Sequence, residues 1–295
     1  MEDVISGAPA PAGGSDALRA AALAKIAREA AYSVGPALRA AFRGQMRVDH
    51  KVDLHDPVTE HDRATEAHLR GLLLAATPGA VVVGEEAGAS GGEGGAGQIE
   101  WYVDPIDGTS NFAAGMAFWC VSIGAVIDGE VVAGAVYDPM ADLLFWADAE
   151  AAWCNDARLE AVSVPEEARA LVITGYPVQR DFRLDGRAVA LDRFARLTEA
   201  FSTLRRPGSA ALSICHVAAG WADAAAGFGV SAWDVSAALL ILRRAGGTYT
   251  PLRLGRAAPG APAHACPGYW AIGAGAQYPT LEAVCAEVDA QRRKT

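Results

Sequence analysis

The stretch Trp101-Tyr102-Val103-Asp104-Pro105-Ile106-Asp107-Gly108-Thr109-Ser110-Asn111-Phe112 joins an apolar segment, typical of a buried strand, to two carboxylates, a glycine and a hydroxyl. Asp104 and Asp107 stand on either side of a proline, so the chain turns between them and both carboxylates can approach one hard cation. Gly108 and Thr109 then open a segment whose backbone N–H groups can face an anion, as at a helix start. The stretch therefore predicts a cation site beside a phosphate site.

Taken alone, this D-x-x-D pattern favours a simpler interpretation, in which Asp104 caps the following helix and Asp107 faces solvent. Three further stretches argue against it. They are Pro57-Val58-Thr59-Glu60-His61-Asp62-Arg63, Gly84-Glu85-Glu86, and Ala232-Trp233-Asp234-Val235-Ser236-Ala237-Ala238, which closes at Ala245-Gly246-Gly247. In this order the stretches resemble the motifs of the inositol monophosphatase family of magnesium-dependent, lithium-sensitive phosphatases. The resemblance extends over about residues 18–286.

Spacing argues against two other phosphate-binding classes. Haloacid-dehalogenase phosphatases need a second aspartate two residues after the first, whereas Asp104 and Asp107 are three residues apart. The glycine-rich run at residues 88–97 is not followed by Gly-Lys-Ser or Gly-Lys-Thr, so it is not a nucleotide-binding P-loop. We expect this run to form a flexible surface loop.

Composition limits the class of protein. With 295 residues, of which 52% are hydrophobic, the chain can bury a large core. The net charge of -10 argues against nucleic acid as a partner, because binding to backbone phosphates needs clustered Lys and Arg. No apolar run approaches the roughly 18 residues of a bilayer span, so we expect no membrane partner and a cytoplasmic location. The five cysteines lack C-x-x-C spacing and are predicted to be buried free thiols.

The pattern of apolar residues predicts an α+β or α/β fold. Residues 1–14 are predicted to be disordered, and residues 15–43 to form two helical stretches with a break near Gly35-Pro36. A β-hairpin is expected about Asp128-Gly129. We expect one phosphatase domain at 15–290, with an α+β half at about 15–157 and an α/β half at about 158–290. The family resemblance implies a layered αβαβα sandwich, like that of inositol monophosphatase and fructose-1,6-bisphosphatase.

Four carboxylates form the candidate metal site. Glu85, Asp104, Asp107 and Asp234 would repel one another in a small space unless divalent cations neutralise them. Magnesium suits such an all-oxygen set. The resemblance assigns Glu85, Asp104 and the main-chain carbonyl of Ile106 to one ion and Asp104, Asp107 and Asp234 to its neighbour, and it implies two or three Mg²⁺ ions in total.

The resemblance also supplies the catalytic residues, Asp62, Thr109 and Glu85. It implies that Asp62 orients Thr109, which activates a metal-bound attacking water. Thr59 and Asp62 also form a T-x-x-D capping pattern, which is the structural alternative for Asp62. The two roles are compatible, because a residue fixed at a helix start is well preorganised.

The candidate substrate-binding residues lie around two predicted helix starts. The backbone N–H groups of Gly108, Thr109 and Ser110 are expected to donate hydrogen bonds to the phosphate. The segment that begins at Gly208 is expected to contact the rest of the substrate. Helix capping is the alternative role for Ser209 and for Asp234. Lys51 matches a family lysine near the phosphate, and a solvated loop lysine is its alternative. The full substrate-binding set is Ile106, Asp107, Gly108, Thr109, Ser110, Gly208, Ser209, Ala210 and Asp234.

The sequence thus predicts a Mg²⁺-dependent phosphomonoesterase for a small phosphorylated metabolite similar to inositol monophosphate and, by resemblance, a lithium-sensitive homodimer. The alternative from another class is a regulatory or binding protein that retains the fold. Gly227 stands seven residues before Asp234, where inositol-specific members have a glutamate that binds the ring hydroxyls. The absence of this glutamate should cost roughly 1.5–3 kcal/mol of the free energy of binding inositol 1-phosphate. Histidinol phosphate, fructose 1,6-bisphosphate and 3′-phosphoadenosine 5′-phosphate are therefore alternative substrates.

Overall fold

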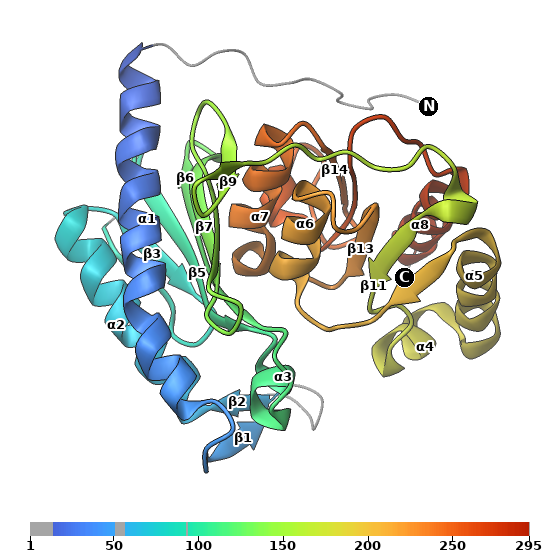
Figure 1. The fold of residues 1–295 in the computed structure, drawn as a ribbon, viewed down its shortest axis with the longest axis horizontal. Helices are drawn as coiled ribbons and strands as arrows, with labels where there is room; N and C mark the ends of the chain where they lie inside the picture. The colour runs from blue at the N-terminus through green and yellow to red at the C-terminus, as the bar shows by residue number, and fades with distance from the viewer. Residues whose placement is uncertain (1–13, 51–56, 93, 295) are drawn as a thin grey trace.

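The computed structural model describes residues 14–50, 57–92 and 94–294 (Figure 1). The predicted disorder of the N-terminus and the position of Lys51 lie outside the described residues, except that Gly14 already begins the first helix. The described residues form two large β-sheets, one two-stranded sheet and three helical layers. Figure 1 shows helices on the outer side of the larger sheet, between the two large sheets, and on the outer side of the smaller sheet.

The first helical layer contains α1 (Gly14–Ala41) and α2 (Glu60–Ala76). α1 is one helix of 28 residues, so the predicted break near Gly35-Pro36 is wrong. Pro36 removes one backbone hydrogen bond from the helix. The packing of α1 offsets this loss, because its alanine-rich side is buried on the larger sheet. Gly35 lies so close to the sheet that a Cβ there would collide with the ring of Tyr137.

The larger sheet has eight strands in the order β10-β9-β8-β7-β6-β5-β3-β4, and only β3 and β5 run parallel. Its strands are β3 (Val81–Gly84), β4 (Gly88–Gly91), β5 (Ile99–Asp107), β6 (Cys120–Ile127), β7 (Glu130–Asp138), β8 (Leu143–Ala147), β9 (Ala152–Cys154) and β10 (Ala157–Arg158). β6 and β7 form the predicted hairpin about Asp128-Gly129. The predicted flexible loop is partly wrong, because Gly88–Gly91 pairs with β3 and satisfies the backbone groups at that edge.

The central layer contains α6 (Ala210–Ala218) and α7 (Ala232–Arg244), which are packed between the two sheets. Both helices are apolar on almost all sides, as expected of helices with no solvent-facing surface. Each fully buried residue such as Leu212 or Ile241 contributes roughly 1.5–3 kcal/mol relative to an exposed one. The position of α7 is therefore fixed by its packing against both sheets.

The smaller sheet has the order β12-β11-β13-β15-β14, with the first three strands parallel and β15 antiparallel to both of its neighbours. Its strands are β11 (Leu171–Thr174), β12 (Thr203–Arg205), β13 (Ala224–Phe228), β14 (Thr248–Leu252) and β15 (Gly268–Ile272). The outer helices are α4 (Gln179–Asp185), α5 (Arg187–Ala200) and α8 (Pro279–Arg292), and the 3₁₀ turns are η1 (Glu167–Arg169) and η2 (Ala263–Ala265). The layer order α, β, α, β, α confirms the predicted sandwich.

Three short elements complete the fold near the C-terminal end of β5 and the N-terminal end of α2. They are β1 (Val48–His50), its antiparallel partner β2 (Pro57–Thr59), and α3 (Thr109–Ala114). The larger sheet draws its strands from residues 81–158 and the smaller from residues 171–272, and the division of one domain into two halves stays a prediction. The five cysteines are buried free thiols, as predicted. No helix among the described residues has the length and apolarity to cross a bilayer.

Candidate active site

β5 carries both aspartates of the deciding stretch to one end of the larger sheet. The register between β5 and β6 shifts between Asp104 and Asp107, where Pro105 has no N–H to contribute to the ladder. Asp104 Oδ1 accepts a 2.9 Å hydrogen bond from the backbone N–H of Ile106, which fixes the turn. Both aspartates are buried. The strand thus continues through Asp107 with an irregularity where a turn was predicted, and neither carboxylate faces bulk solvent.

The start of α2 brings Asp62 to the same place. Its Oδ2 accepts hydrogen bonds from the backbone N–H of Thr59 at 2.7 Å and from the Thr59 hydroxyl at 2.5 Å, which completes the capping box. Its Oδ1 accepts a 3.0 Å hydrogen bond from the hydroxyl of Thr109, the first residue of α3. Asp62 is fully buried. Capping and contact with Thr109 therefore use different oxygens of one carboxylate.

Asp107 faces the N-terminus of α6. Its Oδ2 accepts hydrogen bonds from the hydroxyl of Ser209 at 2.5 Å and from the N–H of Ala211 at 2.7 Å, and its Oδ1 accepts one from the N–H of Ala210 at 3.3 Å. Ser209 is also the N-cap of α6, since its hydroxyl accepts from the N–H of Leu212 at 3.2 Å. The donors at the start of α6, which were expected to face the substrate, contact Asp107 in this structure.

Asp234 lies in the first turn of α7. Its Oδ2 accepts a 2.8 Å hydrogen bond from the N–H of Ser231, the N-cap residue. Asp234 therefore does take part in capping α7, as the alternative interpretation predicted. The hydroxyl of Ser122 in β6 donates a 3.1 Å hydrogen bond to the carbonyl of Trp233 and joins this turn to the larger sheet. These contacts place Asp234 at the junction of the two sheets.

Four carboxylates in this region interact electrostatically. Burial raises the pKa of Asp104 well above its ordinary value of 3.8, and the charges of Glu85, Asp107 and Asp234 raise it further. Burial also raises the pKa of Asp107 to about 6, although the hydrogen bonds from α6 oppose the shift. The pKa of Asp234 is raised by burial and by Asp107. So much negative charge in one place is unfavourable without a cation.

The donor set therefore fits magnesium chemically, because all its members are oxygens that need a neutralising charge. Among the described residues, however, no three His, Cys, Asp or Glu side chains are arranged to hold a metal ion. The hydrogen bonds from Ser209 and Ala211 turn Asp107 toward α6. The charges of Glu85, Asp107 and Asp234 nevertheless act on Asp104, so the four carboxylates lie near one another.

Glu66, which the sequence analysis missed, holds the turn that contains Glu85. This fully buried side chain accepts hydrogen bonds from the N–H of Glu86 at 2.6 Å and of Ala87 at 3.0 Å, and it pairs with Arg70 at 2.8 Å. Its position four residues after Asp62, on the same side of a helix, was the available signal.

Asn111 is a second residue that was missed. Its side-chain amide donates to the carbonyl of Phe118 at 2.7 Å and to that of Pro207 at 2.6 Å, so it joins α3 to the loop before α6. Gly208 follows in that loop, and a Cβ at Gly208 would lie 3.3 Å from this amide. The two predicted anion-binding segments are thus brought together by one amide.

Gly108 precedes α3 with a φ of 101°, a left-handed conformation that favours glycine. Thr109 and Ser110 occupy the first helical positions, where backbone N–H groups have no partner within the helix. The hydroxyl of Thr109 lies 3.0 Å from the carbonyl of Ile106 as well as from Asp62, and its single hydrogen can serve only one of them at a time.

A sequence model of the inositol monophosphatase family matches residues 20–291. The chain belongs to the inositol monophosphatase family. Within this family, it is 34% identical over 232 residues to a protein of Aquifex aeolicus named fructose-1,6-bisphosphatase/inositol-1-monophosphatase, which covers 77% of this chain and 84% of that protein.

The chain is also 36% identical over 227 residues to Nus factor SuhB of Pseudomonas aeruginosa, which covers 75% of this chain and 82% of that one. Among solved structures, the extragenic suppressor protein SuhB of Bartonella henselae superposes with a TM-score of 0.77 and 28% identity over 92% of this chain and 99% of that one. Relatives of this inositol monophosphatase family member thus carry both phosphatase and SuhB names, and the fold is that of the family.

Proposed function

We propose that this protein is a Mg²⁺-dependent phosphomonoesterase that hydrolyses a small phosphorylated metabolite. The observation that carries the proposal is the contact between the hydroxyl of Thr109 and the buried carboxylate of Asp62, beside the carboxylate cluster of Asp104 and Asp107. A hydroxyl held by a carboxylate next to a cation site is what the activation of water requires. A protein that only binds partners has no chemical need for this pair.

The magnesium ions would be held by Glu85, Asp104, Asp107, Asp234 and the carbonyl of Ile106. Bound magnesium would supply the positive charge that lowers the pKa of water and stabilises the phosphate and the leaving oxygen. The raised pKa values of Asp104 and Asp234 support this assignment, because burial and the neighbouring carboxylates raise them and a bound cation would oppose both effects.

Two side chains of the protein would accept the proton of the attacking water in turn. As water attacks phosphorus, its proton passes to Thr109 Oγ1 and the hydroxyl proton of Thr109 passes to Asp62 Oδ1. The bond from phosphorus to the ester oxygen breaks, its electron pair stays on that oxygen, and the released alkoxide takes a proton from solvent water to give the alcohol. Burial raises the pKa of Asp62, although hydrogen bonds from Thr59 and Thr109 oppose the shift, so Asp62 is a stronger base than an exposed aspartate. Thr59 holds the other oxygen and keeps Oδ1 directed at Thr109.

The backbone N–H groups of Gly108, Thr109 and Ser110 would bind the phosphate, and the segment of Gly208, Ser209 and Ala210 would contact the rest of the substrate. Asn111 supports this division of roles, because it joins the two segments. At Gly227 the surface offers no carboxylate, and the ring of Tyr269 occupies the space a Cβ would need. This favours substrates other than inositol 1-phosphate.

The test is release of inorganic phosphate from inositol 1-phosphate, histidinol phosphate, fructose 1,6-bisphosphate and 3′-phosphoadenosine 5′-phosphate, before and after chelation of magnesium. We expect turnover of at least one ester that stops on chelation and returns with Mg²⁺. Full activity in a metal-free sample would contradict the mechanism. Lithium sensitivity and a homodimer are expected from the family resemblance, and inhibition assays and light scattering test them. A cytoplasmic location is expected from the pattern of apolar residues, and cell fractionation tests it.

A regulatory role is the second candidate, because relatives such as that of Pseudomonas aeruginosa are named Nus factor SuhB. The two candidates are separable by one variant. Thr109→Ala would stop hydrolysis and leave a purely regulatory function intact, since Thr109 contacts Asp62 inside the site.

A further inference from the structure

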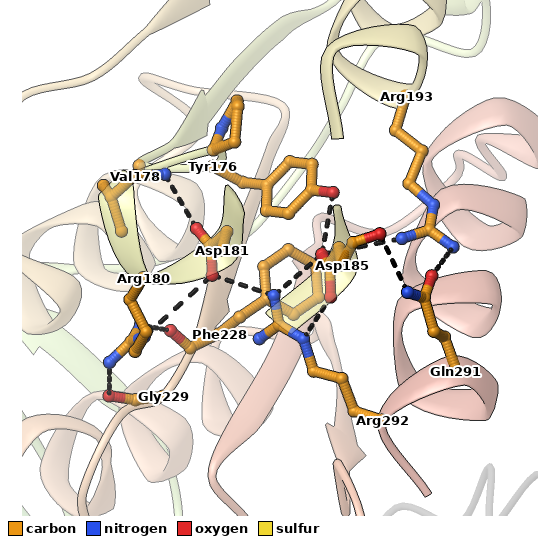
Figure 2. A network of polar contacts seen from close by, with 12 residues as sticks. Tyr176, Val178, Arg180, Asp181, Asp185, Arg193, Phe228, Gly229, Gln291 and Arg292 are labelled. Atoms are coloured by element: carbon orange, nitrogen blue, oxygen red, sulfur yellow. Dashed lines mark hydrogen bonds and ion pairs between the residues drawn. The ribbon is translucent and has the colours of Figure 1, made fainter. Parts of the chain in front are cut away.

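A second site lies at the edge of the smaller sheet where β13 and β14 end and β15 begins. It is a cavity of about 320 Å³, within the size range of small-ligand sites, and three arginines line it. Arg180 comes from α4, Arg256 from the turn after β14, and Arg292 from the end of α8. Figure 2 shows Arg180 and Arg292 beside the two aspartates they contact.

Positive charge dominates the cavity wall. Arg292 pairs with Asp185 at 2.7 Å and with Asp181 at 2.8 Å, and these two buried carboxylates are also shared with other arginines. Asp185 lies 3.5 Å from Arg193, and Asp181 lies 4.0 Å from Arg180. Asp181 and Asp185 thus share their negative charge among more than two guanidinium groups, and Arg256 adds a further guanidinium group, which is exposed. The cavity suits an anion.

Arg180 offers a donor for such an anion. Its two terminal nitrogens donate to the carbonyls of Phe228 and Gly229. Its Nε is buried and faces Oδ1 of Asp181 at 4.0 Å, too far for a hydrogen bond, and among the described residues it makes none. Burial lowers the pKa of Arg180, the charge of Asp181 opposes this shift, and the charges of Arg292 and Arg256 add to it. An anion in the cavity would supply counter-charge and acceptor oxygens for these guanidinium groups.

The cavity lies close to the candidate active site. The guanidinium of Arg180 covers Gly229, where a Cβ would collide with it. Gly229 is two residues before Ser231, whose N–H is 2.8 Å from the carboxylate of Asp234. Two residues span at most about 7 Å, so Gly229 lies within roughly 10 Å of that carboxylate. This separation is comparable to the length of a small molecule that carries two anionic groups.

We propose that the cavity lined by Arg180, Arg256 and Arg292 binds a second anionic group, a phosphate or a carboxylate, next to the candidate active site. When this group belongs to the substrate, the proposal rests on the phosphatase function and narrows its substrates to compounds with two anionic groups. When it is a free anion, the site stands independently of that function.

The first arm of the test compares fructose 1,6-bisphosphate with fructose 1-phosphate, using the full chain with Mg²⁺. Arg256→Gln removes an exposed charge from the cavity, and Arg253→Gln removes an equally exposed charge, three residues away, that does not line it. We expect Arg256→Gln to lower the ratio of kcat/KM for the bisphosphate to that for the monophosphate by about tenfold or more, as for the loss of a charge-assisted hydrogen bond. Arg253→Gln should leave the ratio unchanged.

The second arm measures binding of inorganic phosphate to the metal-free full chain by calorimetry. Without metal, the carboxylate cluster repels phosphate, so binding reports the arginine cavity. Weaker binding by Arg256→Gln with an unchanged kcat/KM ratio assigns the cavity to a free anion. If Arg256→Gln changes neither the ratio nor phosphate binding, the proposal is wrong. If no ester is hydrolysed, the phosphatase function fails, while the calorimetry still decides whether the cavity binds anions.

Discussion

The hydroxyl of Thr109 lies 3.0 Å from Oδ1 of Asp62, although 47 residues separate the two in the chain. The contact joins the start of α2 to the start of α3. Thr59 occupies the other oxygen of the carboxylate, so Asp62 cannot turn away from Thr109 without losing its cap. This pair is the part of the site whose removal has the clearest consequence.

Thr109→Ala should lower kcat by about 10²–10⁴-fold, the range for loss of a positioned proton-transfer group. The matched control is Thr109→Ser, which keeps the hydroxyl and should retain most of the activity. Steady-state kinetics on the best ester of the panel, with thermal melting to confirm folding, would check this. Equal losses in both variants would show that the hydroxyl has no role.

Asp104→Asn should stabilise the metal-free protein at neutral pH but not at acid pH. The pKa of Asp104 is raised well above 3.8 in the folded state, so the native protein takes up protons more readily than the unfolded chain. Stability from this group is fully present below about pH 3.8 and is lost as the pH rises through the folded pKa. The asparagine carries no charge to bury at any pH. Melting temperatures in a chelator at pH 4, 6 and 8 should therefore diverge with rising pH, and a difference that is constant with pH would contradict the explanation.

Glu66→Gln should weaken magnesium binding without touching a proposed ligand. The variant leaves the shape of the side chain but removes the charge that holds Arg70 and the N–H groups of Glu86 and Ala87, at an expected cost of about 1.5–3 kcal/mol of stability. The turn that contains Glu85 then loses its anchor. Magnesium titrations of activity should show a higher half-saturating concentration, whereas the control Glu60→Gln, at an exposed position of the same helix, should match the parent. Unchanged magnesium dependence in Glu66→Gln would limit Glu66 to a structural role.

Inositol 1-phosphate should not be the best substrate in the panel. Gly227 cannot accept hydrogen bonds from ring hydroxyls with a side chain, and the loss of a charged acceptor corresponds to about ten- to a hundredfold in kcat/KM. Gly227→Glu should not restore recognition, because its Cβ would lie 2.7 Å from the ring of Tyr269, which is buried and stacked on Tyr249. Side-by-side values of kcat/KM would decide, and a clear preference for inositol 1-phosphate would show that another residue replaces the glutamate.

The sequence by itself determined the local parts of the site. Pro105 had to interrupt the regular pairing between its two aspartates, Thr59 and Asp62 had to form a capping box, and Asp128-Gly129 had to close a hairpin. Each of these features depends on residues a few positions apart, and their backbone conformations follow from proline, glycine and short polar side chains. The order of the family motifs then extended the local features to a whole fold.

Only the tertiary structure decided which of these parts meet. It keeps α1 unbroken through Pro36, and it pairs Gly88–Gly91 with an open sheet edge. It also turns Asp107 toward the start of α6 and places Glu66 under the turn of Glu85. The free energy that selects these arrangements comes from burial and hydrogen bonding between segments far apart in the chain, which outweigh the local preferences of proline and glycine and which no short stretch of sequence contains.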